Sequence, residues 1–322
     1  MISTDDQDGT LHGNRQDWAI QASGLTRFFG GHCAVNGLSL NVPRGSVLAF
    51  IGRNGAGKTT TIRMLLGLLT PTRGQSTILG HDSVKLPPQV RARIGYMAEG
   101  HPVYPWMRVG QYAGFQSSCY PHWRQSTFAA VIDYFAILPQ TKAGDLSHGQ
   151  RAGLHLATTL AIEPELLMLD DPATGLDPAA RRSLLEAMIY FTRNRERTIF
   201  FSTHLLDDVE RIADQVAVLD YSVLRASCSM ETFRDRVRQI SGHFSSPPPS
   251  DLPEIPGLLR ATRSDNDLTL IVANDTGRIE RILNSLGAES VDEQPLSLED
   301  ALTAYVGRQG KKSLFSTVGG EP

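Results

Sequence analysis

Hydrophobic and polar side chains alternate along the chain with two different periods, and the changes of period mark the predicted elements. Residues 38–42 alternate between apolar and polar positions, which predicts a strand with one buried face. Residues 46–51 and 166–170 contain short apolar runs, typical of strands that are buried on both faces. Residues 59–69 carry four apolar side chains at helical spacing, and a turn at residues 71–74 ends this helix.

The same two patterns continue toward the C-terminus. Residues 97–165 favour helices and contain scattered aromatic side chains. The elements predicted after them are a helix at 178–193, a strand at 198–202, a helix at 205–213 and a strand at 216–220. Because strands that alternate with helices form parallel sheets covered by helices, the chain is predicted to be an α/β protein with a largely parallel sheet.

A change in composition marks the predicted domain boundary. The sequence SSPPPS at residues 245–250 is typical of a stiff, extended spacer. Beyond it, strands at 258–263 and 268–273 and helices at 278–286 and 298–306 predict a small α/β domain. We therefore expect a flexible tail at 1–21, a main domain at 22–240 with a helical subdomain at about 97–165, a linker at 241–257 and a C-terminal domain at 258–322.

Composition and charge exclude several classes of protein. The 322 residues suffice for about two domains. They carry 31 Lys and Arg against 34 Asp and Glu, a net charge of −3, which argues against broad nucleic-acid binding. Three widely spaced cysteines provide neither a disulfide framework nor a CxxC metal pair. No stretch approaches the roughly 20 apolar residues that span a bilayer, so we expect any membrane contact to pass through a partner.

The strongest chemical signal is the sequence GRNGAGKT at residues 52–59, directly after a buried strand and directly before a helix. Glycines let the backbone N–H groups surround phosphate oxygens, the lysine reaches the β- and γ-phosphates, and the hydroxyl of the threonine binds Mg²⁺. A glycine-rich turn with a surface lysine is the alternative, but it does not require this full spacing. The residues expected to bind the nucleotide here are Gly52, Asn54, Gly55, Ala56, Gly57, Lys58, Thr59 and Thr60.

A second signal is the aspartate that ends the strand at 166–170. The carboxyl ends of strands in α/β sheets face the ligand crevice, which places Asp170 to hold Mg²⁺ through water. A strand that merely stops at a polar residue is the alternative for Asp170 alone. A phosphate loop elsewhere in the same sheet favours the magnesium role. Together the two motifs predict a nucleotide triphosphate tail and Mg²⁺ in this site; the resemblance described next implies that the nucleotide is ATP.

With these motifs the chain resembles the ATP-binding subunits of ABC transporters, over about residues 25–220, roughly the first two thirds. The resemblance implies a P-loop NTPase ABC cassette, in which an antiparallel β subdomain and a helical subdomain join the mostly parallel sheet. In that family the sequence LSGGQ opens a helix and contacts a nucleotide held by a second subunit. The matching residues here are LSHGQ at 146–150, so Ser147, Gly149 and Gln150 are expected to bind nucleotide.

The resemblance also assigns roles to single residues. Asp171 stands where the family has a glutamate that orients the attacking water, and His204 matches the switch histidine. Asp177 matches the D-loop aspartate, and together with Pro178 it is also typical of a helix N-cap. For His204, the alternative is a buried histidine of the core.

Two further matches concern the adenine ring and the metal. Phe29 is expected to stack on adenine, with Phe28 as the alternative and ordinary packing as a third interpretation. Glu99 occupies the position of the Q-loop glutamine and is expected to take part in catalysis and in holding Mg²⁺.

Three positions depart from the family pattern. His148 replaces a signature glycine, Glu99 replaces a glutamine, and Asp171 replaces a glutamate. The last change withdraws the carboxylate by one methylene, about 1.5 Å. Because a displacement of about 1 Å costs roughly a hundredfold in rate, we expect slow rather than absent ATP hydrolysis.

The resemblance finally implies partners. The phosphate loop and the signature belong to different sites, so a homodimer, or a pair with another ATPase subunit, is expected to enclose ATP between Lys58 of one copy and Ser147 of the other. Aromatic segments at 104–107 and 120–123 are expected to meet a membrane permease, unless they pack in the helical core. This predicts a cytoplasmic protein, peripheral on the inner face of the membrane, that powers transport, expected to be export, without binding nucleic acid. The alternatives are a regulatory ATP-binding module with weak hydrolysis and a soluble ABC ATPase that acts outside transport.

Overall fold

The computed structural model describes residues 18–192, 197–275, 277–294 and 296–306. The chain divides into two units between Met230 and Glu231, and each is described by itself. The expected N-terminal tail lies outside the described residues as far as residue 17. Its last four positions belong to a strand, because Ala19 and Ile20 are fully buried in the core of the first unit.

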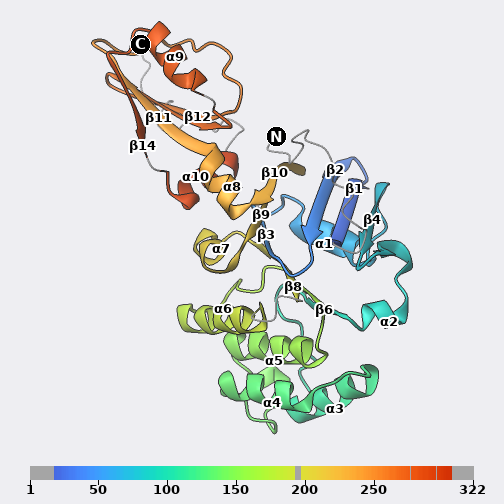
Figure 1. The fold of residues 1–322 in the computed structure, drawn as a ribbon. Coiled ribbons are helices and arrows are strands. Elements are labelled where there is room, and N and C mark those ends of the chain that lie inside the picture. Colours follow the sequence, from blue (N-terminus) through green and yellow to red (C-terminus); the bar gives the residue numbers. More distant parts are fainter. Residues whose placement is uncertain (1–17, 193–196, 276, 295, 307–322) are drawn as a thin grey trace, which may run out of the picture. The chain divides into compact units, whose positions relative to one another are not determined.

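A six-stranded sheet in the order β10-β9-β3-β8-β7-β6 forms the centre of the first unit (Figure 1). All neighbouring strands are parallel except β10, which runs antiparallel to β9. The strands are β3 (Val47–Gly52), β6 (Ile94–Met97), β7 (Leu166–Leu169), β8 (Thr198–Thr203), β9 (Gln215–Asp220) and β10 (Val223–Ser229). Every residue of β3, β7 and β8 is buried, which confirms the strands predicted from apolar runs.

A second, antiparallel sheet in the order β2-β1-β4-β5 belongs to the same unit. Its strands are β1 (Trp18–Phe29), β2 (His32–Pro43), β4 (Arg73–Ile78) and β5 (His81–Asp82). Leu38, Leu40 and Val42 of β2 are buried and the residues between them are exposed, which confirms the predicted alternation. The P-loop NTPase architecture expected from the sequence, with a mostly parallel sheet beside an antiparallel one, is therefore present.

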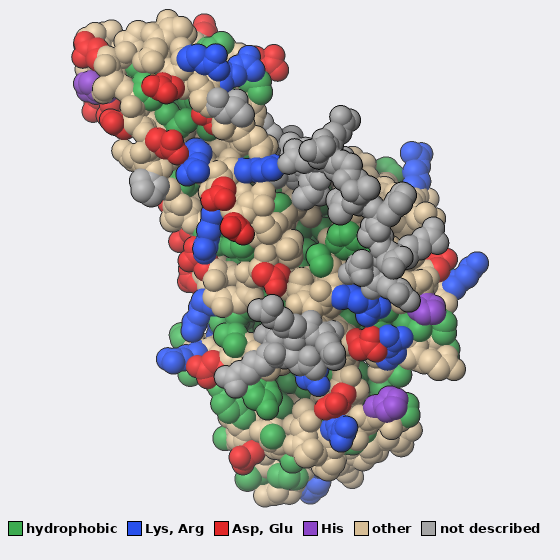
Figure 2. Space-filling model, in the orientation of Figure 1, with side chains coloured by type: hydrophobic (Ala, Val, Ile, Leu, Met, Phe, Trp, Pro, Cys, Tyr) green, Lys and Arg blue, Asp and Glu red, His purple; other side chains and the backbone are tan. Residues whose placement is uncertain are grey.

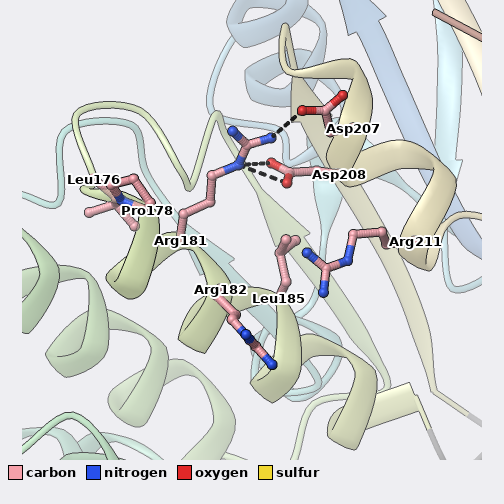
Figure 3. Close-up of a pocket in the computed structure, with 8 residues that line it drawn as sticks. All are labelled: Leu176, Pro178, Arg181, Arg182, Leu185, Asp207, Asp208 and Arg211. Carbon is pink, nitrogen blue, oxygen red and sulfur yellow. Dashed lines mark hydrogen bonds and ion pairs between the residues drawn. The ribbon is translucent and has the colours of Figure 1, made fainter.

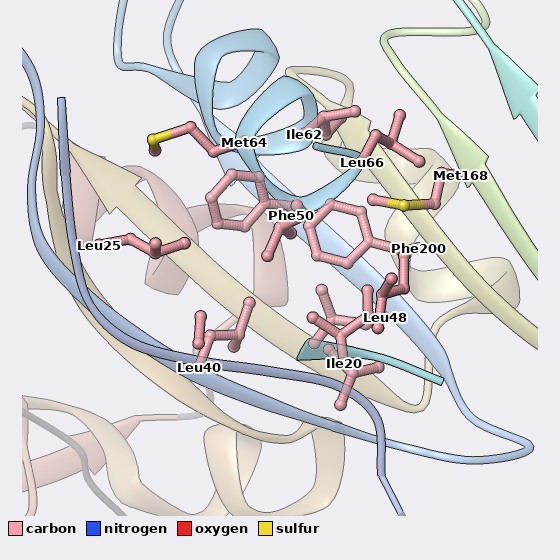
Figure 4. Close-up of a cluster of buried hydrophobic side chains, with 14 of the residues drawn as sticks. Ile20, Leu25, Leu40, Leu48, Phe50, Ile62, Met64, Leu66, Met168 and Phe200 are labelled. Carbon is pink, nitrogen blue, oxygen red and sulfur yellow. The ribbon is translucent and has the colours of Figure 1, made fainter. Parts of the chain in front are cut away.

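The two sheets and helix α1 (Lys58–Leu65) share one hydrophobic core (Figure 4). Phe50 of the central sheet packs against Phe200, with ring centroids 5.2 Å apart. Leu25 and Leu40 enter this core from the antiparallel sheet, together with Ile62 and Met64 from α1. Because these fully buried side chains hold α1 against β3, the loop between the two elements is anchored at both ends.

Helices complete the first unit. They are η1 (Ser83–Lys85), α2 (Pro88–Arg91), α3 (Val109–Cys119), α4 (Gln125–Tyr134), η2 (Ala143–Asp145), α5 (His148–Ala161), α6 (Pro178–Thr192) and α7 (Leu206–Ile212). Helices α3, α4 and α5 lie in the predicted helical region and surround a core of their own, which includes Tyr112, Phe128 and Leu154. Figure 2 shows acidic and basic side chains interspersed over the face that it draws, in keeping with the small net charge.

The second unit is built on a four-stranded antiparallel sheet in the order β12-β13-β11-β14. Its elements are α8 (Met230–Arg236), which begins at the boundary, β11 (Val237–His243), β12 (Leu258–Ser264), β13 (Asp267–Ala273), α9 (Arg278–Ser285), β14 (Ser290–Gln294) and α10 (Leu298–Val306). Ile240, Leu268, Leu270 and Leu283 lie in its core.

The unit boundary falls before residue 240, where the sequence placed the end of the main domain. β11 pairs with β13 and β14, so it belongs to the second unit, and its mixed polarity did not mark it as a strand. The proline-rich segment expected as a linker connects β11 to β12 within this unit. The side chain of Arg263 donates hydrogen bonds to the carbonyl oxygens of Pro249 and Ser250, at 3.2 and 2.9 Å.

Candidate functional site

The loop between β3 and α1 has the backbone geometry that phosphate binding needs. Gly57 caps the N-terminus of α1 with a φ of 108°, and a Cβ atom there would lie 2.3 Å from the carbonyl oxygen of Ala34. Gly55 also has a positive φ, of 81°. Only glycine fits position 57, because any side chain would be both strained and in collision with backbone. The α1 N-terminus is thereby left open to an anion.

A pocket of about 450 Å³ opens over this loop. It is lined by Phe29, His32, Ala34, Asn54, Gly55, Gly57, Lys58, Thr59, Thr60, Glu99 and Asp171. The structure thus brings most predicted phosphate-loop residues together with Phe29, Glu99 and Asp171. Phe29 is about half exposed, and the Arg27 guanidinium lies 4.8 Å from the centroid of its ring. Phe28, the alternative stacking residue, is not among the lining residues.

Lys58 is held at the base of the pocket by two oxygens. Its Nζ donates a hydrogen bond to the carbonyl oxygen of Gly52 at 3.0 Å and lies 3.2 Å from Oδ2 of Asp171. Both charged side chains are more than nine-tenths buried. Removing one partner of such a buried pair leaves the other charge uncompensated.

Asp171 has three further constraints. Its backbone has a φ of 45°, in the left-handed region, where aspartate is better tolerated than most residues. Its N–H donates to Oγ of Ser202 at 2.8 Å, and its Oδ1 lies 3.0 Å from Nδ1 of His204. The predicted catalytic pair, Asp171 and His204, is therefore in direct contact, and Asp171 faces Lys58 through its other oxygen.

Asp170 fits a magnesium ligand. Its Oδ1 accepts hydrogen bonds from Oγ of Ser202 at 2.9 Å and from Oγ1 of Thr59 at 3.1 Å. Its Oδ2 is buried without a hydrogen-bond partner, although buried polar atoms are normally paired. Burial raises the pKa of Asp170, against the effect of the two hydroxyl hydrogen bonds.

The donor set around Asp170 suits Mg²⁺ better than a metal held by protein alone. No group of three or more His, Cys, Asp or Glu suited to a metal ion occurs in the described part of the chain. Mg²⁺ commonly takes one or two protein oxygens and completes its shell with phosphate and water. Thr59 and Asp170 provide such oxygens; Thr59 and Glu99 line the phosphate-loop pocket, whereas Asp170, the hydrogen-bond partner of Thr59, is not among the lining residues.

The signature residues lie at the N-terminus of α5. Ser147 is the N-cap, and its Oγ accepts a hydrogen bond from the N–H of Gln150 at 3.2 Å. The side-chain oxygen of Gln150 accepts a hydrogen bond from the N–H of Ser147, which completes a capping box. A Cβ at Gly149 would lie 2.7 Å from that of Ala180, so this glycine allows α5 and α6 to approach closely. Ser147, Gly149 and Gln150 are absent from the lining of the phosphate-loop pocket.

Asp177 caps α6. Its Oδ1 accepts hydrogen bonds from the N–H groups of Ala179 and Ala180, at 3.0 and 2.9 Å, which confirms the predicted N-cap. Like the signature residues, Asp177 does not line the phosphate-loop pocket.

Three residues of the site were not predicted from the sequence. His32 and Ala34 line the pocket from β2, and no local motif marks them. Ser202 bridges Asp170 and the backbone of Asp171 from a fully buried position. Its polarity inside an apolar strand, two residues before His204, was the available signal.

The fold and the site together define a P-loop ATPase of the ATP-binding cassette type. Residues 35–174 match the ABC transporter family. The bacitracin transport ATP-binding protein BcrA of Bacillus licheniformis is 32% identical over 222 residues, which cover 68% of this chain and 72% of that protein. The Nod factor export ATP-binding protein I of Rhizobium sp. (strain N33) is 28% identical over 305 residues, which cover 91% of this chain and 99% of that protein. The chain belongs to the family of ABC transporter ATP-binding proteins.

Solved structures agree on the fold. An ATP-binding subunit of an ABC transporter superposes with a TM-score of 0.61 at 25% identity, over 67% of this chain and 92% of that one. The ATP-binding cassette MJ0796, in a dimeric post-hydrolysis state with ADP and phosphate, gives a TM-score of 0.59 at 17% identity, over 66% of this chain and 98% of that one. This chain is an ATP-binding and ATP-hydrolysing subunit of an ABC transporter.

Proposed function

We propose that two copies of the chain close head to tail around ATP and Mg²⁺ and power export through a separate membrane permease. One observation carries this proposal: the phosphate-loop pocket contains Lys58 and Asp171 but none of Ser147, Gly149 and Gln150. A complete site of the family's kind therefore needs the signature of another copy. The dimeric cassette MJ0796 supports such a pairing, which for this chain is with itself or with a second ATPase subunit.

The contacts around Asp171 give an order of events. The β- and γ-phosphates of ATP compete with Asp171 for the Nζ of Lys58, because both are anions at the same cation. Asp171, once separated from Lys58, is still held by Ser202 and His204 and can accept a hydrogen bond from the attacking water. When bound at Thr59 and Asp170, Mg²⁺ offsets the phosphate charge. Phe29, which lines the pocket, would stack on adenine, and Glu99, which lines the same pocket, would help to hold Mg²⁺.

The permease is proposed to dock beside the segment that follows Glu99. Tyr104 and Trp106 are exposed there, with ring centroids 5.4 Å apart. Trp123, from the other aromatic segment, packs against Phe128 of the helical core at 5.4 Å and suits an interface less well. No helix in the described ranges is long and apolar enough to cross a membrane. A docked permease would place the chain at the inner face of the membrane.

Export is proposed from the relatives. BcrA is named for bacitracin transport, DrrA of Streptomyces peucetius for daunorubicin and doxorubicin resistance, and the rhizobial protein for Nod factor export. DrrA is 35% identical over 218 residues, which cover 63% of each chain. The cargoes named for these relatives differ, so they support the direction of transport and no single substrate.

Phosphate release tests the proposal. The full chain is assayed with MgATP, alone and with its permease in vesicles, and Lys58→Ala is the control. Turnover that the permease stimulates supports a transport ATPase. ATP-dependent pairing without phosphate release above the control would instead support the regulatory module, which the short side chain of Asp171 favours. Turnover that no permease changes would support an ABC ATPase acting outside transport.

A further inference from the structure

A partly buried ion pair joins helices α6 and α7 (Figure 3). The Nε of Arg181 donates to both carboxylate oxygens of Asp208, at 2.8 and 3.0 Å. Asp208 is 3% exposed, whereas its neighbour Asp207 is largely exposed and lies 4.0 Å from the guanidinium. The contact of Arg181 with buried Asp208 is therefore the close one, and that with Asp207 is peripheral.

Each partner lies one helical turn from a loop of the proposed site. The N–H of Arg181 donates to the carbonyl oxygen of Asp177 at 2.9 Å, in the first turn of α6. Asp208 lies in the first turn of α7, which starts just after His204, and the N–H of Leu205 donates to Oγ1 of Thr203 at 3.0 Å. The ion pair thus connects the start of the helix after Asp177 with the start of the helix after His204.

An open space lies beside the ion pair. A pocket of about 240 Å³ lies beside the pair, lined by Leu176, Pro178, Arg181, Arg182, Leu185, Asp207, Asp208 and Arg211. In Figure 3 the two acidic residues and Arg211 reach it from α7, and Arg181, Arg182 and Leu185 from α6. The single Nε–H of Arg181 donates to both oxygens of Asp208, so we expect this contact to hold the spacing of the two helix starts.

We propose that Arg181 and Asp208 are positioning residues that keep Asp177 and His204 in one fixed relation. A contact of Asp177 with the second copy is then transmitted through the pair to His204, and from there to Asp171, which lies 3.0 Å away. The inference rests on the proposed roles of Asp177 and His204. It assigns Arg181 and Asp208 no contact with ATP.

The chain contains a matched control on the same helix. Arg182 pairs with Glu186, one turn further along α6, at 2.9 Å between Nε and Oε1. This pair has the same chemistry, but both partners are exposed and both belong to α6. Arg182→Lys therefore removes an equivalent arginine contact without touching the link to α7.

The test compares Arg181→Lys with Arg182→Lys in the full chain. Lysine keeps the positive charge but lacks the guanidinium Nε–H that donates to Asp208. We therefore expect Arg181→Lys to lower kcat about tenfold, with KM for ATP within about twofold and little change in Tm. Arg182→Lys should resemble wild type. The exchange Arg181→Asp with Asp208→Arg should recover part of the lost kcat.

The background of His204→Ala separates positioning from stability. If the pair acts through His204, Arg181→Lys adds no further loss of kcat in that background. An additive loss, an equal loss from Arg182→Lys, or a fall in Tm that accounts for the lost activity would overturn the inference. If His204→Ala alone keeps wild-type turnover, the proposed role of His204 fails. That outcome also overturns the inference, and the His204→Ala variant alone is enough to reveal it.

Discussion

Lys58 and Asp171 form a buried ion pair, with 3.2 Å between Nζ and Oδ2. The other oxygen of Asp171 contacts Nδ1 of His204 at 3.0 Å. One carboxylate therefore contacts both Lys58 and His204. In the proposed mechanism, phosphate binding at Lys58 and the freeing of Asp171 are then a single event.

The Lys58–Asp171 pair predicts that removing one charge lowers the stability of the fold and that removing both charges restores most of it. Lys58→Met leaves Asp171 buried beside His204 alone, and we expect a loss of about 3 kcal/mol in the free energy of unfolding. The double variant Lys58→Met, Asp171→Asn removes the uncompensated charge and should recover most of that loss. Denaturant unfolding of both variants measures the effect. Equal free energies of unfolding for the single and the double variant would show that the two charges are not coupled.

Lengthening the carboxylate at position 171 should raise turnover. Asp171→Glu restores the methylene that the family pattern contains, and we expect about a tenfold gain if reach limits the rate. The left-handed backbone at this residue, with a φ of 45°, acts against glutamate and limits the gain. Phosphate release at saturating ATP is the measurement, with Asp171→Asn as the inactive reference. An unchanged or lower rate would show that the backbone is already adapted to aspartate.

His101 predicts a loss of stability in acid. It is 3% exposed, and its Nε2 has no hydrogen-bond partner. Burial lowers the pKa of His101 from 6.5 to about 4, with the neighbouring His155 acting in the same direction. Between these two pH values His101 is protonated in the unfolded chain and neutral in the folded chain. The free energy of unfolding is therefore undiminished above pH 6.5 and falls as the pH drops toward 4, by about 3 kcal/mol at most.

The matched variant for this prediction is His101→Asn. The φ of His101 is 49°, and asparagine tolerates the left-handed region without titrating. Thermal unfolding between pH 7 and 4.5 should show a weaker pH dependence for the variant. Some dependence remains, because burial also lowers the pKa of His155. A profile identical to wild type would exclude His101 as its source.

The unit boundary predicts where the chain can be shortened. Every residue of the phosphate-loop pocket precedes Met230, so residues 1–230 should bind MgATP with the affinity of the full chain. Ending the chain at 244 instead keeps β11 without β13 and β14, its two partners, and should promote aggregation. Titration with a fluorescent ATP analogue checks the affinity. Weaker binding by the 1–230 chain would show that the second unit contributes to the site.

Local patterns predicted the central strands of the main sheet and missed several other strands. The phosphate loop and strands β3, β7 and β8 were recognisable because each is a continuous signal of five to eight residues. Strands β10 and β11 mix polar and apolar side chains, and β5 has two residues, so pairing with neighbours decides their conformation.

The same limit applies to the site. Phosphate-loop residues follow one another in the sequence, whereas Thr59 and Asp170 are 111 residues apart and meet only through the order of strands in the sheet. Arg181 and Asp208 are 27 residues apart on helices with no shared pattern. Contacts of this kind join elements that are distant in the sequence, and no window along the chain contains both partners.

The separation of Ser147 from the phosphate-loop pocket has a genetic consequence. In a head-to-tail pair, a copy damaged only at Lys58 still lends its signature to a neighbour, and a copy damaged only at Ser147 still offers its loop. Coexpression of these two alleles, each inactive by itself, would leave mixed pairs with one undamaged site. Complementation between such alleles distinguishes this shared arrangement from an enzyme whose catalytic centre is contained in one polypeptide.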